Sequence, residues 1–238
     1  MASDIHSYLN QMLGAARSKS GDELLVFTVE QVLASVGPKQ ADVLRKAAVP
    51  RWVDASVLRV LRESDTGNER VLELLRAYSF VRELGDGRLA YHDEVRRALL
   101  EEWRRERPAE LQQLHRRLYQ YFSQRTTPPG SAGRAMPLMP DSNLLSVVPM
   151  SGHADLLRRE AIYHLLHLDQ EQGLRELRSN FEYLEDAHRL AEAELLLQMA
   201  SETPLGPRER RWVHYLRARA LMGALSLDAA AEQLEALR

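Results

Sequence analysis

The sequence contains no cysteine, which excludes disulfide bonds, thiolate metal sites and a cysteine nucleophile. It has no run approaching the roughly 20 apolar residues that span a bilayer, and it does not open with a basic stretch followed by an apolar run. Lysine occurs only at positions 19, 39 and 46, so arginine carries nearly all of the positive charge. The missing apolar runs predict a cytoplasmic protein without a membrane segment, and the absence of cysteine agrees.

The motifs of several catalytic families are also missing. The nearest stretch to a GxxxxGK[ST] phosphate loop, residues 14–21, lacks the spacing needed to cradle phosphates, and neither GxSxG nor HExxH occurs. His164 and His167 lie three residues apart, a spacing at which two imidazoles can share a metal, but no thiolate supports them. We therefore predict a protein that is not an enzyme and that holds no metal or cofactor of its own.

Charge of one sign is not in excess. The chain has 32 Lys+Arg and 34 Asp+Glu, a formal net charge of -2. Residues 1–150 carry 21 basic against 19 acidic residues, and residues 151–238 carry 11 against 15. Neither part has the bulk charge that attracts nucleic acid or anionic membranes.

Most of the chain has apolar residues at helical spacing. In the N-terminal half this predicts helices from Ile5 to about Gly14 and over residues 24–36, 38–48, 54–63, 68–78 and 93–105, with another beginning at Pro108. Asp54 and Asn68 are the predicted N-caps of their helices, and Gly37 with Pro38 separates two others.

The period changes after the fifth helix. Residues 80–84 and 88–92 are two short segments around Gly85-Asp86-Gly87, a pattern typical of a β-hairpin. The resulting order of three helices, a two-stranded wing and a further helix is that of a winged helix.

Residues 125–152 have the composition of a linker, with prolines and glycines from 128 to 133 and further prolines at 137, 140 and 149. Helices are then predicted over 154–168, 170–184, 186–201, 207–223 and 227–237. The last two fit a tetratricopeptide-like pair, because Ala218 and Ala230 lie twelve residues apart with Leu221 and Leu234 at the accompanying apolar positions. No helix caps the apolar face of the last one before Arg238, so we expect the natural protein to continue.

The predicted fold class is therefore mainly α. Its domains are N-terminal helices (1–36), a winged helix (37–124), a Pro/Gly-rich linker (125–152) and tetratricopeptide-like helical hairpins (153–238).

Four short motifs carry a family resemblance: Ala47-Ala48-Val49, the segment Leu74–Val81, the segment Tyr91–Arg96, and Leu114–Leu118. Together they make residues 44–122 resemble the winged-helix region of STAND-type signalling ATPases, in which helical repeats commonly follow. The resemblance implies a regulatory module whose winged helix packs on a nucleotide-binding domain and whose repeats sense a protein partner. ADP or ATP would be bound only with a P-loop domain that this chain lacks.

His92 and Asp93 match part of a methionine-histidine-aspartate motif of that family, in which the histidine contacts bound ADP. Tyr91 stands where the methionine would be. The resemblance makes His92 and Asp93 candidates for nucleotide sensing. The alternative is structural: Asp93 caps the next helix and His92 ends a strand.

A winged helix can also bind DNA through the helix that follows its turn. The candidate DNA contacts in that alternative are Asn68, Arg70, Arg76, Arg82 and Arg88. Acidic neighbours such as Glu69, Glu73 and Glu83 oppose it, so a protein contact is favoured. In the helical hairpins, Trp212 and Tyr215 are candidates for partner binding, with core packing as the alternative.

Overall fold

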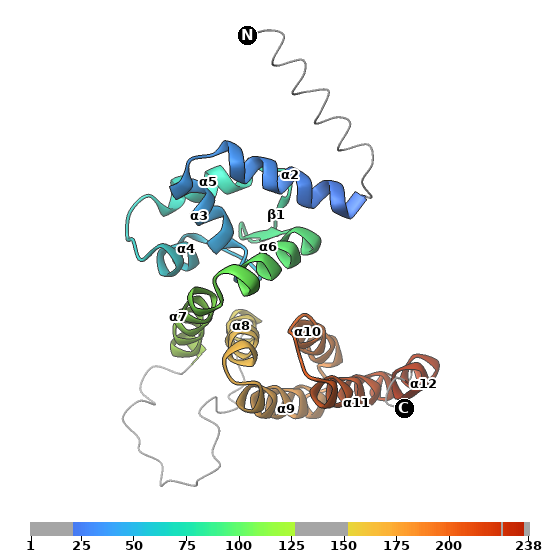
Figure 1. Cartoon of the computed structure of the whole chain (residues 1–238). Coiled ribbons are helices and arrows are strands. Elements are labelled where there is room, and N and C mark those ends of the chain that lie inside the picture. Colours follow the sequence, from blue (N-terminus) through green and yellow to red (C-terminus); the bar gives the residue numbers. More distant parts are fainter. Residues whose placement is uncertain (1–20, 127–151, 225, 236–238) are drawn as a thin grey trace, which may run out of the picture. The chain divides into compact units, whose positions relative to one another are not determined.

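The computed structural model describes residues 21–126, 152–224 and 226–235 (Figure 1). The chain divides into two compact units, with the division after Leu114. Two predictions lie outside the described residues: the helix from Ile5 to about Gly14, and the linker character of residues 127–151.

The first unit has the element order of a winged helix. It comprises the helices α2 (Gly21–Ser35), α3 (Pro38–Ala47), α4 (Ala55–Arg62) and α5 (Asn68–Arg76), the strands β1 (Val81–Glu83) and β2 (Leu89–Tyr91), α6 (Asp93–Glu106), and the start of α7 (Pro108–Thr126). The predicted order of three helices, a two-stranded wing and a helix is confirmed.

Two predicted helix caps have different outcomes. Asp54 caps α4, because its carboxylate accepts a hydrogen bond from the backbone N–H of Val57 at 2.7 Å. The prediction that Asn68 caps α5 was wrong. Gly67 occupies that position with a φ of 72°, a left-handed conformation that glycine adopts at little cost. The buried amide of Asn68 instead accepts a hydrogen bond from Arg62 and donates one to the Ser64 carbonyl.

The wing is an antiparallel pair in which Val81 lies opposite Tyr91 and Glu83 opposite Leu89. Its turn uses Gly87 at a φ of 81°. Val53 and Leu89 exchange two backbone hydrogen bonds of 2.7 and 2.9 Å, so the segment before α4 extends the sheet by one bridge. The sequence did not predict this bridge.

The core of the first unit collects apolar side chains from its helices and its wing. The most deeply buried include Leu44, Val57, Leu58, Leu61, Leu75, Phe80, Leu89 and Val95. The ring of Phe80 lies 5.0 Å from that of Tyr78 and 5.7 Å from that of Tyr91. Aromatic packing therefore joins the segment between α5 and β1 to the strand β2.

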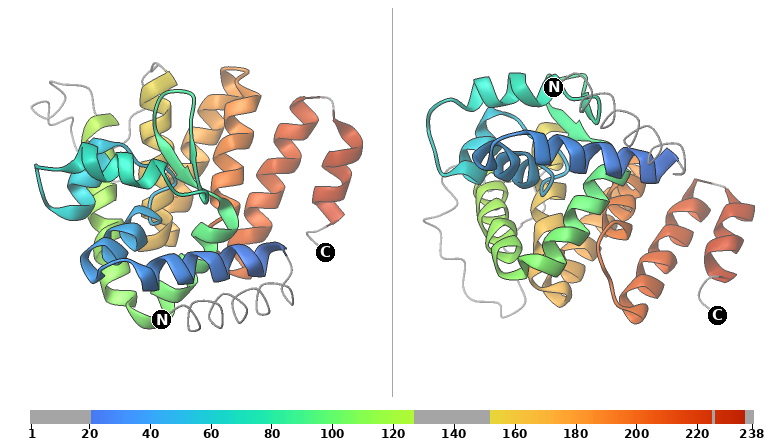
Figure 2. Two further views of the ribbon diagram at one scale, coloured as in Figure 1. Left: turned by 90° about the horizontal axis from the view of Figure 1, so that it is seen from above. Right: turned by 45° about the horizontal axis from the view of Figure 1, so that its top comes forward.

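The second unit is a stack of helical hairpins (Figure 2). Its helices are α8 (Gly152–Leu168), α9 (Gln170–Asp186), α10 (Leu190–Ser201), α11 (Pro207–Gly223) and α12 (Leu227–Glu235), close to the predicted ranges. Each helix contacts the next, and α8 also contacts α10 while α9 contacts α11. Alternate helices therefore form two layers, the arrangement of a helical-repeat array (Figure 1).

From His115 onward α7 belongs to the second unit. This division differs from the predicted domain boundary at residue 124. The reason is packing: Leu118 and Phe122 are fully buried, and the ring of Phe122 stacks on His164 of α8 at 5.7 Å.

Close helix packing in the second unit depends on small residues. A Cβ on Gly173 of α9 would lie 2.8 Å from the Cα of Leu166 in α8, so the two backbones approach as closely as a glycine allows. Ala218 and Ala230 are buried, as the predicted tetratricopeptide-like pairing of α11 and α12 requires, whereas Leu234 is 40% exposed. In the described parts of the chain, no helix is both long and apolar enough to cross a lipid bilayer.

Candidate functional site

The junction of β2 and α6 holds the two residues predicted to sense a nucleotide. His92 is half-buried at the N-cap position of α6, and its backbone N–H donates to the carbonyl of Phe80 at 3.0 Å. Asp93 is the first residue of α6, and its side chain is 84% exposed. The alternative role of Asp93 as the helix cap was therefore wrong, because His92 stands there and makes no side-chain capping bond. The nucleotide-sensing role stays a prediction.

Tyr91 and Arg96, which flank His92 in the sequence, hold this junction in place through hydrogen bonds to backbone carbonyls. The buried hydroxyl of Tyr91 donates to the carbonyl of Leu44 at 2.8 Å, and its burial raises the pKa of the phenol well above the usual value of 10.0. The buried guanidinium of Arg96 donates to the carbonyls of Val49 and Pro50, each at 3.2 Å. Two of the motifs that carry the family resemblance, residues 47–49 and 91–96, therefore meet in the structure.

Sequence reasoning missed the roles of both anchors. Each bond joins residues 46 or 47 positions apart in the chain. The only available signal was that both residues belong to a motif of the resemblance. The anchors fix where the wing ends and α6 begins, and so they position His92 relative to α3.

The candidate DNA contacts lie mostly beside carboxylates. Arg76 is 3.1 Å from Glu83, Arg82 is 4.0 Å from Asp93, and Arg88 is 2.5 Å from Asp86. The hydrogen bond from Arg88 also lowers the pKa of Asp86, which keeps that carboxylate ionised. Arg70 is exposed, whereas Asn68 is buried. Three of the four arginines therefore face an acid of the same unit, which weakens the positive field that phosphates require.

The candidate partner-binding residues lie on α11. Trp212 is half-buried and packs against the hydrophobic core of the second unit, while it also lines a groove of about 560 Å³ between α9 and α11. Tyr215, one turn further on, is 45% exposed. Trp212 therefore contributes to core packing, as the alternative interpretation predicts, and its role in partner binding stays a prediction.

A cluster of histidines lies inside the second unit. The Nδ1 atoms of His115 and His164 are 2.9 Å apart, and the ring of His167 stacks on that of His115 at 4.1 Å. Both His115 and His164 are buried. Because one Nδ1 must donate and the other accept, only one of the two imidazoles carries a proton on this atom. The sequence indicated the pair on α8 but not His115 of α7.

Among the described residues, no group of three or more His, Asp or Glu side chains is arranged to hold a metal ion. The cluster is best understood as buried polar packing between α7 and α8.

Comparison with known proteins gives one match. Residues 29–111 match the family model of the MalT winged helix domain. The match runs from α2 to the start of α7 and includes the whole wing. It supports a winged helix similar to that of MalT in the first unit. No curated protein and no solved structure matches the chain.

Proposed function

We propose that the chain is a regulatory and protein-interaction module of a larger STAND-type signalling regulator that acts in the cytoplasm. The winged helix packs on a nucleotide-binding domain, and the helical hairpins bind a protein partner. The observation that carries this proposal is the match of residues 29–111 to the MalT winged helix domain, on a first unit with the corresponding element order.

The surface of the first unit supports a protein contact over a DNA contact. Arg76, Arg82 and Arg88 face carboxylates of their own unit. His92 lies half-buried at a junction held by Tyr91 and Arg96, so its position is well defined without a ligand. An imidazole in such a place can donate to a phosphate oxygen of ADP bound by the neighbouring domain.

The mechanism is a change of packing between two states. ADP favours the state in which the winged helix rests on the nucleotide-binding domain, and partner binding to the hairpins favours the other. Each ligand can shift this equilibrium only by its difference in affinity for the two states.

The direct test uses the complete protein. Its reading frame is expected to encode a GxxxxGK[ST] phosphate loop, and a frame without one would contradict the proposal. In that protein His92→Ala should accelerate the release of bound ADP. His188→Ala, an exposed histidine of the second unit, is the matched control and should leave the release rate unchanged.

A titration with a labelled DNA duplex at low salt separates the proposal from the DNA-binding alternative. We expect no rise in fluorescence anisotropy at protein concentrations of about 1–100 μM, where even non-specific DNA binders respond. Binding that weakens steeply with added salt would show phosphate contacts and favour the alternative.

A further inference from the structure

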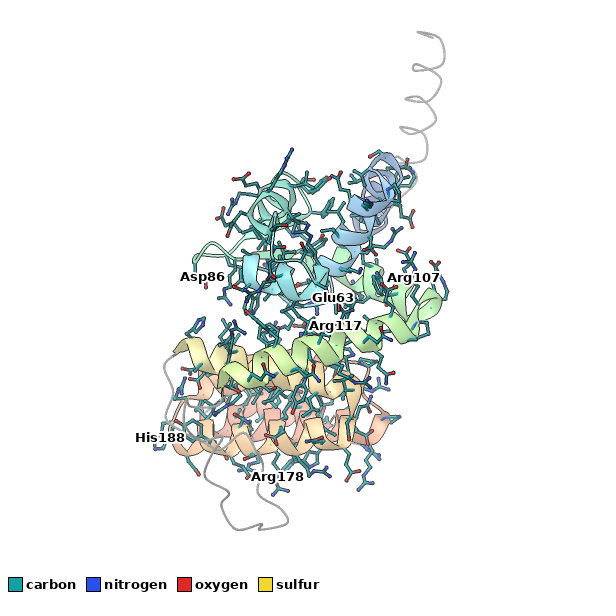
Figure 3. The ribbon with its side chains drawn as sticks, turned by 90° about the vertical axis from the view of Figure 1, so that its left-hand side faces the viewer. Glu63, Asp86, Arg107, Arg117, Arg178 and His188 are labelled. Carbon is teal, nitrogen blue, oxygen red and sulfur yellow. The ribbon has the colours of Figure 1, made fainter. Side chains whose placement is uncertain are left out.

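The groove between α9 and α11 has a chemical character that none of the comparisons assigns. It is lined by the apolar side chains of Leu174 and Trp212, by three arginines and by two glutamates, namely Arg175, Arg178, Arg208, Glu171 and Glu209. The guanidinium of Arg178 lies 5.9 Å from the centre of the Trp212 ring. Figure 3 shows Arg178 at the outer edge of the second unit, where its side chain reaches away from the helices.

Of the three arginines that line the groove, two form ion pairs within the second unit and one does not pair with any described residue. Arg175 pairs with Glu171 at 2.6 Å and Arg178 with Glu182 at 2.7 Å, both on α9. Such exposed pairs on one helix contribute little to stability, so an incoming carboxylate can compete for them. The side chain of Arg208 makes no hydrogen bond or ion pair with any described residue.

Beyond the groove, α11 carries further exposed apolar side chains. Tyr215 is 45% exposed and Met222, about two turns further, is 42% exposed. Arg219 lies between them, with its guanidinium 6.0 Å from the Tyr215 ring. This face therefore alternates apolar and cationic groups over several turns, a composition typical of protein-binding surfaces.

We propose that this groove binds an acidic peptide segment that carries an aromatic or large aliphatic side chain. The side chain packs on Leu174 and Trp212, and flanking carboxylates accept hydrogen bonds from Arg208 and Arg178, whose guanidinium groups can hold a carboxylate through two parallel bonds. A single-stranded nucleic acid, which can also stack a base on an exposed aromatic ring and contact arginines, is the competing ligand that the test has to separate from the peptide.

This inference rests on the proposed function, because it names the class of partner that the helical hairpins bind. The probe is a short fluorescein-labelled peptide in which glutamates flank one tryptophan and one leucine, titrated with the whole chain and followed by anisotropy. The comparison probes are the same peptide with lysine in place of glutamate, and a labelled single-stranded DNA.

Two charge reversals on the first turns of α11 provide the matched test. Arg208 lines the groove and Arg210 does not, yet both are exposed and neither pairs with a described residue. Arg208→Glu should weaken binding of the acidic peptide about tenfold or more, whereas Arg210→Glu should change it little. Both substitutions lie at the surface, so neither is expected to disturb folding.

Three outcomes would overturn the inference: no binding of the acidic peptide, equal effects of the two reversals, or tighter binding of the single-stranded DNA. Binding of the lysine peptide in place of the acidic one would reject the partner's charge but leave the proposed interaction role intact. The proposed function fails separately, through the phosphate-loop, ADP-release and duplex tests, because these report on the winged helix.

Discussion

The two units bury polar side chains in different ways. In the winged helix, Tyr91 and Arg96 bond to backbone carbonyls, and Asn68 bonds to the carbonyl of Ser64. In the second unit, buried polar side chains also meet one another between helices: His115 contacts His164, and Arg158 donates at 3.3 Å to Asn180, whose amide in turn donates to the carbonyl of Glu176.

The difference follows from how each fold satisfies its backbone. A long helix bonds its own N–H and C=O groups, so a stack of helices leaves few of them for side chains. The winged helix has short elements joined by irregular turns, whose carbonyls need donors from elsewhere. Polar side chains in its core therefore determine the path of the chain, whereas those between helices determine which helices pair.

The largest effect should come from removing a donor in the winged helix. Arg96→Met leaves the buried carbonyls of Val49 and Pro50 without that donor, and we expect the free energy of unfolding of the first unit to fall by about 3 kcal/mol. Hydrogen exchange of peptides from α3 and α6 measures this loss. Arg97→Met, at an exposed neighbour, should change it by less than about 0.5 kcal/mol, and equal effects would refute the anchoring role.

A smaller effect is expected from breaking a side-chain pair between helices. His115→Leu removes the partner of the His164 Nδ1 atom, which should destabilise the second unit by about 2 kcal/mol. Urea unfolding, with exchange of the α8 amides as the local probe, gives the value. Arg116→Ala, exposed on the same helix, is the control. A stable His115→Leu variant would mean that the pair contributes nothing beyond apolar packing.

Gly173→Ala tests the close backbone approach of α8 and α9 in the second unit. In most helices this change stabilises by about 0.5–1 kcal/mol, but here the new Cβ would meet the Leu166 backbone and force α8 and α9 apart. We expect a loss of about 1–2 kcal/mol, measured from the urea midpoint by circular dichroism. Gly85→Ala has open space around its Cβ and should not show this loss.

The smallest effect concerns the pH dependence of the second unit. Burial raises the pKa of Glu176 above its usual value of 4.5, although Arg158 and Arg175 oppose the shift. The folded state therefore binds this proton more tightly than the unfolded state, and the resulting stability is lost as the pH rises through the folded pKa.

Glu176→Gln keeps a neutral side chain at every pH. It should be more stable than the wild type near pH 8 by about 1 kcal/mol or less, and equal to it in mild acid. Thermal unfolding across this pH range tests the crossover. Glu171→Gln, at an exposed position of the same helix, should follow the wild type, and a parallel pH profile for Glu176→Gln would contradict the prediction.

Local signals explain which parts of the fold were predictable. The start of α11 follows from Pro207, that of α4 from the Asp54 cap, and the wing turn from its glycines, because each acts on its immediate neighbours. The cap of α5 was mispredicted because Gly67 and Asn68 both suit such a position, and only tertiary packing draws the Asn68 side chain inward.

The sequence indicated which residues are candidates for the sites, but not which residues contact them. Sequence patterns brought out His92 and Trp212, yet the anchors around His92 and the groove beside Trp212 depend on residues far along the chain. The His115–His164 contact joins positions 49 residues apart. Helical periodicity reports which face of each helix is apolar, and it contains no information on which faces meet.

Trp212 is more exposed than the other two tryptophans, so its intrinsic fluorescence can report on the groove. Trp52 and Trp103 in the first unit are 6% and 2% exposed, whereas Trp212 is half-buried in a groove bordered by arginines. Iodide, an anionic quencher of indole emission, should therefore reach Trp212 first and be concentrated there by the positive groups. Protection of the Trp212 emission from iodide by an unlabelled acidic peptide that contains leucine but no tryptophan would then report occupancy of the groove.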